Sequence, residues 1–190
     1  MKEHSNTEGA QAASPNSWRD RVAASLARRR VAFGFLTAAA VFVLATPTWA
    51  SWRAGLLVAI AGEALRFWAA GHLEKSREVT SSGPYRLTRH PLYLGSSVIA
   101  LGAVMAAHSL VVALLAAIYM LATIAAAVRT EEAFLRRTFG EAYDRYQRSA
   151  APAADRRFSF ARAMRNREHR AVLGLAGGFA LLALRVLLPI

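Results

Sequence analysis

Apolar and charged segments alternate along this chain at lengths that suit a lipid bilayer, which a helix of about 20 apolar residues can cross. We predict five membrane-spanning helices, at residues 31–49, 52–70, 91–107, 110–128 and 171–190. Pro47 ends the first of these stretches, and His108-Ser109 forms a short turn between the third and the fourth. No segment shows the two-residue alternation that is typical of a strand. The pattern therefore predicts an all-α integral membrane protein with about five transmembrane helices.

The pattern of apolar and polar segments divides the chain into three parts. Residues 1–30 form a polar tail with a candidate interfacial helix, and residues 31–149 form the transmembrane core. Residues 150–190 hold a short linker, a basic stretch and the final span. We expect the basic stretch to form a surface helix that faces anionic lipid headgroups.

The charge of the chain is distributed as in a membrane protein. The net charge is +12, and Lys2 and Lys75 are the only lysines, so the excess comes from arginine. The arginines flank the apolar stretches: residues 129–170 hold eleven of them, and the turn after the third span holds none. Because arginine accumulates on the cytoplasmic side, we expect a bacterial inner-membrane protein with its N-terminus in the cytoplasm. This placement argues against nucleic acid as a partner.

Metal and disulfide chemistry are not indicated by the sequence. The chain has no cysteine, which excludes disulfides and thiolate metal sites. His72, His108 and His169 do not cluster with acidic residues at ligand spacing, so we predict no metal site.

The segment GPYRLTRHPLYLG, residues 83–95, separates the second span from the third and carries candidate chemistry. Gly-Pro is a turn signal, and Pro91 suits the first turn of a helix. Arg89 and His90 should then lie on a bend over a helix N-terminus, which attracts anions. Tyr85 and Tyr93 offer aromatic faces for a cation. The alternative is that these tyrosines and arginines are ordinary anchors at the membrane boundary.

A second segment, RTEEAFLRRTFGEAYDRYQR at residues 129–148, follows the fourth span. On a helix its apolar stripe comprises Glu131, Leu135, Phe139 and Tyr143, continued by Tyr146. We expect Glu131 on the buried face of this helix and Glu132 rotated off it. A carboxylate on an apolar face near the membrane is costly and usually functional. The alternative is a structural ion pair with Arg86 or Arg89.

Together the two segments resemble the isoprenylcysteine carboxyl methyltransferase family and the related membrane phospholipid methyltransferases. The likeness covers about residues 62–148 and rests on RHPxYxG followed by EExxLxxxFGxxYxxY. The resemblance implies an integral membrane methyltransferase that uses S-adenosylmethionine, bound in a cytoplasm-facing pocket.

The resemblance also implies which residues line this pocket. The matching positions are Tyr85, His90, Pro91, Leu92, Tyr93 and Glu131. Val79 and Thr80 precede the Gly-Pro turn in a stretch that matches less well, and we add Arg89 and Glu132 as neighbours of the matching positions. Glu131 and His90 are the candidate catalytic bases for a neutral amine or hydroxyl acceptor, whereas a carboxylate or thiolate acceptor needs none.

The substrate is less well indicated than the cofactor. Family members that methylate prenylcysteine have an Arg four residues before the pocket Glu, where this chain has Ala127. Arg129 is close in sequence but lies about 200° around the helix from Ala127. Glu63 and Arg66 match a pattern in bacterial relatives and line the acceptor cavity in one interpretation, or form a mutually satisfied pair in another.

We therefore expect an S-adenosylmethionine-dependent methyltransferase whose acceptor is a lipophilic or small carboxylate, thiol or amine. Membrane lipids are its expected partners. One alternative is a membrane reductase that uses NADPH, although the phosphates of that cofactor would be repelled by Glu131 and Glu132. The other is a small helical membrane protein without enzymatic activity. The sequence indicates neither the acceptor nor the oligomeric state.

Overall fold

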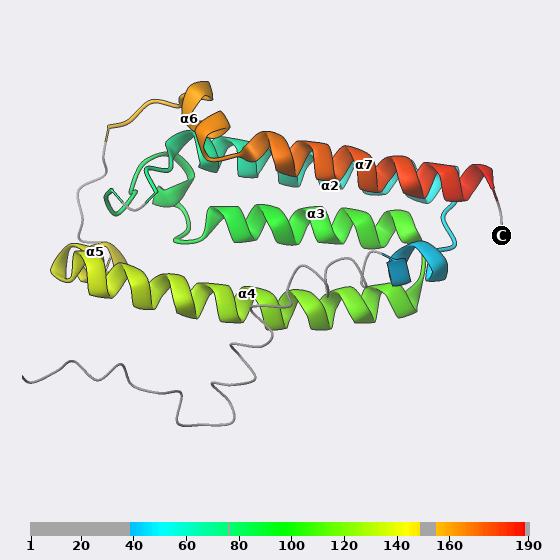
Figure 1. Cartoon of the computed structure of the whole chain (residues 1–190), viewed down its shortest axis with the longest axis horizontal. Coiled ribbons are helices and arrows are strands. Elements are labelled where there is room, and N and C mark those ends of the chain that lie inside the picture. Colours follow the sequence, from blue (N-terminus) through cyan, green and yellow to red (C-terminus); the bar gives the residue numbers. More distant parts are fainter. Residues whose placement is uncertain (1–38, 76, 149–154, 189–190) are drawn as a thin grey trace, which may run out of the picture. The chain divides into compact units, whose positions relative to one another are not determined.

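The computed structural model describes residues 39–75, 77–148 and 155–188, and all regular structure within them is helical (Figure 1). Residues 39–44 are helical where the description begins. The further elements are α2 (Trp49–His72), the 3-10 helix η1 (Gly83–Arg86), α3 (Pro91–Ala107), α4 (Leu110–Phe139), α5 (Glu141–Gln147), α6 (Phe160–Arg165) and α7 (Glu168–Leu187). The predicted all-α fold is confirmed, while the polar tail and its candidate interfacial helix lie outside the described residues.

Three of the described helices, α2, α4 and α7, are long and apolar enough to cross a membrane. The third predicted span corresponds to α3, an apolar helix of 17 residues. At a rise of about 1.5 Å per residue, α3 is about 26 Å long, slightly shorter than the hydrocarbon core of a bilayer. Residues 31–38 of the first predicted span lie outside the described part of the chain.

Several predicted boundaries differ from the structure, and the second span, expected at residues 52–70, is α2 at Trp49–His72. The first span was expected to reach residue 49, but residues 45–48 are not helical and Trp49 already belongs to α2. Pro47 disfavours a helical conformation in the residue before it, and Thr48 caps α2 by accepting a hydrogen bond from Ser51 N. The last span begins at Glu168 rather than residue 171.

Helix α4 is continuous for 30 residues, from Leu110 to Phe139. At about 45 Å it is longer than the hydrocarbon core of a bilayer, which is about 30 Å thick. The fourth predicted span and the predicted Glu131-bearing helix are therefore one element, which carries its last turns out of the apolar layer. His108, in the left-handed conformation with φ 51°, and the N-cap Ser109 make the turn before it, as predicted.

Helices α2 and α3 run side by side (Figure 1) and approach closely because glycines face each other across the interface. A Cβ atom on Gly102 would lie 2.5 Å from Gly55 O and 2.6 Å from Ala59 N. Such contacts between small residues are a common basis of helix packing in membranes. Helix α7 lies against the same pair, and the Trp52 indole donates a hydrogen bond of 2.9 Å to Phe179 O.

Replacing Gly102 with Ala should separate α2 from α3. A methyl group at this position must displace backbone atoms rather than a flexible side chain, so we expect a loss of about 1–3 kcal/mol of stability, typical of overpacking. Thermal unfolding in detergent measures this effect. Gly177→Ala in α7 is the control, because no described atom lies within 4 Å of its added Cβ. Equal melting temperatures for the two variants would contradict the tight interface.

Candidate functional site

The segment from η1 to α3 has the bend that the sequence predicts. Gly83 adopts φ 55°, and its lack of a Cβ leaves room for the ring of His72, from which a Cβ would lie 2.6 Å. His90 is the N-cap of α3 with φ −131° and ψ 57°, and Pro91 is the first helical residue. The N–H groups of Tyr93 and Leu94 both donate to His90 O at 3.1 Å. The imidazole of His90 is thereby held at the start of α3.

The long helix α4 brings two carboxylates to this imidazole. His90 Nε2 lies 3.3 Å from Glu132 Oε1, and His90 Nδ1 lies 3.9 Å from Glu131 Oε2. Arg89 Nη1 is 3.8 Å from the same Glu132 oxygen. Two segments about 40 residues apart in sequence therefore form one cluster, which we call the His90 cluster: Arg89, His90, Glu131 and Glu132.

The burial of the two carboxylates differs from the sequence-based expectation. The Glu132 side chain is 27% exposed and the Glu131 side chain 43%, so the carboxylate expected to be rotated off the buried face is the more buried one. The two consecutive residues of α4 both contact the imidazole of His90, Glu131 at Nδ1 and Glu132 at Nε2. The rotation of α4 against this ring therefore determines which of the two carboxylates is more buried. The rest of the predicted stripe is confirmed: Leu135, Phe139 and Tyr146 are partly buried and Tyr143 is buried.

Arg89 forms its ion pair with Glu132 rather than with Glu131. The described contacts of Glu131 are with His90 and with the Tyr93 hydroxyl, and they do not test the alternative of a pair with Arg86. The Tyr93 ring also stacks at a tilt on the His90 ring, with centroids 5.7 Å apart. Glu131 remains the more accessible carboxylate of the cluster.

Tyrosines from η1 and α5 lie close enough to the His90 cluster to interact electrostatically with its charges. The Tyr146 hydroxyl donates a hydrogen bond of 2.8 Å to Tyr85 O, which joins α5 to η1. Burial raises the pKa of Tyr85, and the charge of Glu131 raises it further. Burial, followed by the neighbouring Tyr143, raises the pKa of Tyr146 to about 12. These phenols are therefore neutral at physiological pH and offer aromatic faces and O–H donors.

One polar atom of the cluster is buried without a hydrogen bond among the described residues, namely His90 Nδ1. Buried polar atoms are normally paired, so this atom has capacity for a ligand or a solvent molecule. The surroundings of Nδ1 combine an accessible carboxylate with a tyrosine ring, and both favour a cation. Arg89, whose side chain is 49% exposed, offers the opposite charge. The donor set fits a small molecule that carries both charges, as S-adenosylmethionine does.

Three further predicted cofactor residues, Val79, Thr80 and Leu92, have no described side-chain contact with the His90 cluster, so their role in binding stays a prediction. Thr80 is buried and its hydroxyl accepts a hydrogen bond from Glu74 N, while Val79 is half-buried. Leu92 contributes its carbonyl to Ser96 Oγ at 2.9 Å. Arg129, a predicted substrate residue, is exposed on α4 and lines an open depression of about 530 Å³, which Glu132 also lines.

The predicted substrate residues Glu63 and Arg66 belong to a separate buried cluster. Arg66 Nε lies 3.7 Å from Glu63 Oε2 and 2.8 Å from Glu168 Oε1. Arg66 Nη1 also donates to Ser96 Oγ of α3. Sequence reasoning missed Glu168, whose only signal is an acidic residue at the start of the last apolar stretch. Arg66 thus connects α2, α3 and α7. Both carboxylate oxygens of Glu63 are buried without a hydrogen bond among the described residues, and Glu63 also lines an open, mainly apolar depression of about 460 Å³. The role of Glu63 and Arg66 as acceptor-lining residues therefore stays a prediction, as does the alternative of a structural pair.

Comparison with known proteins gives one match. The family model described as phospholipid methyltransferase matches residues 30–142, which is more than half of the chain. No curated protein and no solved structure matches the chain.

Proposed function

Since the chain belongs to the phospholipid methyltransferase family and is a membrane methyltransferase, we propose that it transfers a methyl group from S-adenosylmethionine to a lipophilic or small acceptor. The observation that carries this proposal is the approach of Glu131 and Glu132 to the two nitrogens of His90, at 3.9 and 3.3 Å. We further propose that the cluster faces the cytoplasm of a bacterial cell, in agreement with the arginine distribution.

The residues of the His90 cluster and its neighbours each suit one group of the cofactor. Glu131 suits the ammonium or the ribose hydroxyls, and Arg89 suits the carboxylate. The faces of Tyr85 and Tyr93 suit the sulfonium. When bound, S-adenosylmethionine supplies an electrophilic methyl group on a positively charged sulfur.

The contribution of the protein to the reaction is position and exclusion of water. The residues named above would hold the cofactor close to the acceptor, and such positioning lowers the entropic part of the barrier. For a neutral amine acceptor, His90 or Glu131 accepts the proton that the acceptor loses. His90 Nδ1 is suited to that role because it makes no hydrogen bond among the described residues.

For the acceptor we favour a lipid of the surrounding membrane over a prenylcysteine carboxylate. The family description names phospholipids, and Ala127 stands where the prenylcysteine-specific members have Arg. Family membership also favours methyl transfer over the two alternatives, an NADPH-dependent reductase and a protein without enzymatic activity.

Calorimetry with S-adenosylhomocysteine tests the proposal. The detergent-purified wild type should bind this product, and Glu131→Gln should weaken binding about tenfold, or about 1.4 kcal/mol, because a charged contact becomes a neutral one. Glu141→Gln is the matched control, since Glu141 is exposed on α5. A folded wild type that binds NADPH but not S-adenosylhomocysteine would reject the proposal. Labelled cofactor with lipid, thiol and carboxylate acceptors would then identify the substrate class.

A further inference from the structure

The C-terminal end of α2 is capped by a distant segment of the chain. The last carbonyl groups of a helix lack partners within the helix and need donors from elsewhere. Here Arg162 Nη1 donates to Gly71 O at 2.6 Å, and Asn166 Nδ2 donates to Ala70 O at 2.8 Å and to Leu73 O at 2.9 Å. These donors come from residues 156–166, which we call the clamp segment. It lies beyond the residues matched by the family model.

Two more contacts complete this cap. Arg156 Nη1 donates to His72 O at 3.3 Å, and the backbone N–H of Ser159 donates to Gly71 O at 3.1 Å. Two guanidinium groups thus lie at the negative end of the α2 dipole, where cations are stabilising. The ring of Phe158 occupies the space beside Gly71, where a Cβ would lie 2.2 Å from it. The clamp segment is therefore fitted to this end of α2 by both polar and apolar contacts.

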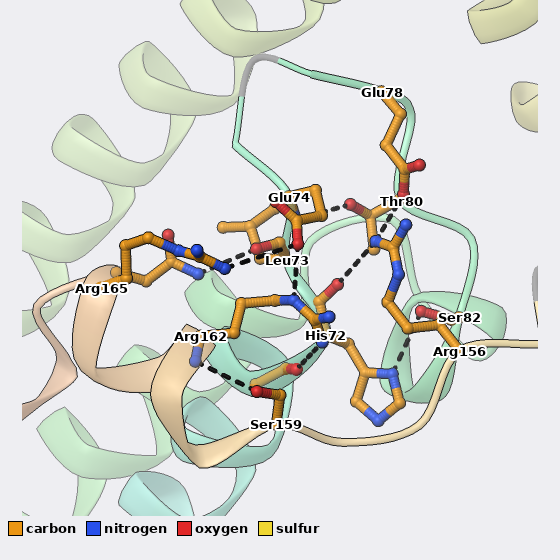
Figure 2. Close-up of polar contacts among 12 residues, drawn as sticks. His72, Leu73, Glu74, Glu78, Thr80, Ser82, Arg156, Ser159, Arg162 and Arg165 are labelled. Atoms are coloured by element: carbon orange, nitrogen blue, oxygen red, sulfur yellow. Dashed lines mark hydrogen bonds and ion pairs between the residues drawn. The ribbon is translucent and has the colours of Figure 1, made fainter.

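The same clamp segment holds the loop that follows α2, described at residues 73–75 and 77–82. Figure 2 shows Arg162 between the end of α2 and Glu74, and its Nε donates to Glu74 Oε1 at 2.8 Å. Arg156 forms an ion pair with Glu78 in the same loop. The hydrogen bond from Arg162 holds the pKa of Glu74 below its ordinary value, so the contact is complete at neutral pH and is lost only as the pH falls through that lowered value.

The loop that the clamp segment holds is also hydrogen-bonded to predicted cofactor residues and their neighbours. Glu74 N donates to Thr80 Oγ1 at 3.3 Å, and the buried hydroxyl of Ser82 lies 3.1 Å from His72 Nδ1. Ser82 is followed directly by the Gly83 turn and then by Tyr85, whose carbonyl accepts from Tyr146. The loop is thus fixed at its start by the clamp segment, in its middle by Thr80 and at its end by His72.

We propose that the clamp segment is a positioning element for cofactor binding, with Arg162 as its central residue. Arg162 reaches both the end of α2 and the loop acid, at a side-chain exposure of 15%. It does not touch the His90 cluster in the described contacts, so it acts through the position of residues 79–85. This inference rests on the proposed function, because it takes those residues to bind S-adenosylmethionine.

Arg162→Ala should weaken the binding of S-adenosylhomocysteine about tenfold in calorimetry, with little change in the turnover number at saturating cofactor. Arg165→Ala is the matched control: it removes the same charge from the same helix, but its side chain is 64% exposed and lies 3.7 Å from Glu74. Glu74→Gln should reproduce part of the Arg162→Ala effect, since it weakens the contact with the loop and leaves the cap on Gly71 O in place. The double variant should add little to Arg162→Ala, because the Glu74 contact is already lost there. If Arg162→Ala does not fold, Arg162→Lys and Glu74→Gln serve instead.

Hydrogen–deuterium exchange of residues 73–82 provides a readout that needs no cofactor. Arg162→Ala should speed exchange there, whereas Arg165→Ala should leave it at the wild-type rate. Unchanged exchange in a folded Arg162→Ala protein, or unchanged cofactor affinity beside faster exchange, would overturn the positioning role. If the wild type itself binds no S-adenosylhomocysteine, the proposed function fails and with it the link to the cofactor. The hydrogen–deuterium exchange rates of residues 73–82 then show separately whether Arg162 holds this loop.

Discussion

Replacing Arg66 with Leu should cost about 3–5 kcal/mol of stability, which is the usual cost of removing one partner from a buried ionic group. Arg66 lies between two acids, 3.7 Å from Glu63 Oε2 and 2.8 Å from Glu168 Oε1. The side chains of these acids are only 10% and 5% exposed. Without the guanidinium, two carboxylates would face each other without a cation in an apolar environment. Either helix α7 should then detach from α2, or the two carboxylates should take up protons.

Unfolding of the detergent-solubilised protein by denaturant measures this loss. Arg53→Leu, on the exposed part of the same helix, is the control and should change stability by less than about 0.5 kcal/mol. The triple variant Glu63→Gln, Arg66→Leu, Glu168→Gln should recover most of the stability, because removing a whole buried ionic group is often close to neutral. Equal stabilities for Arg66→Leu and Arg53→Leu would show that the buried group does not hold these helices together.

Neutralising both carboxylates of the His90 cluster, with Glu131→Gln and Glu132→Gln together, should lower kcat/KM for methyl transfer about a hundredfold, or about 2.7 kcal/mol. Glu131 and Glu132 lie at 3.9 and 3.3 Å from the two nitrogens of one imidazole. Either single variant leaves one negative charge to balance a cationic ligand, whereas the double variant leaves none. The expected loss is therefore larger than that of either single change.

Transfer of a labelled methyl group to the acceptor identified in the screen provides the measurement. The double variant should keep the melting temperature of the wild type within a few degrees, which separates a loss of chemistry from a loss of fold. Glu141→Gln combined with Asp144→Asn changes two exposed acids of α5 and should leave the rate near that of the wild type. A double variant with near wild-type kcat/KM would exclude Glu131 and Glu132 from the reaction.

Local features of the site could be predicted from the sequence because each depends on residues close together in the chain. Pro91 begins α3, the Gly83-Pro84 pair makes a turn, and His108 ends α3 in the left-handed conformation. The approach of His90 to Glu131 was also expected, but through the family resemblance and the arginine distribution rather than through any local pattern.

Contacts between distant segments were decided by the tertiary structure. A helical repeat places Glu131 on a stripe, but the rotation of α4 against His90 determines which of two consecutive acids is more buried, and Glu132 is the more buried one. In the same way, the acid nearest to Arg66 is Glu168, 102 positions later in the chain, rather than Glu63 on the same helix.

The sequence alone was enough to predict a set of apolar helices, one of which begins at a proline directly after a polar motif. Hydrophobic period, proline and charge act over a few residues, so they define helices and their ends. The tertiary structure alone decided that residues 156–166 cap α2 and hold Glu74, contacts that span 88 positions for Arg162. Such pairings depend on how helices pack in three dimensions. The pattern of apolar and polar residues along the chain does not show which distant segments come into contact.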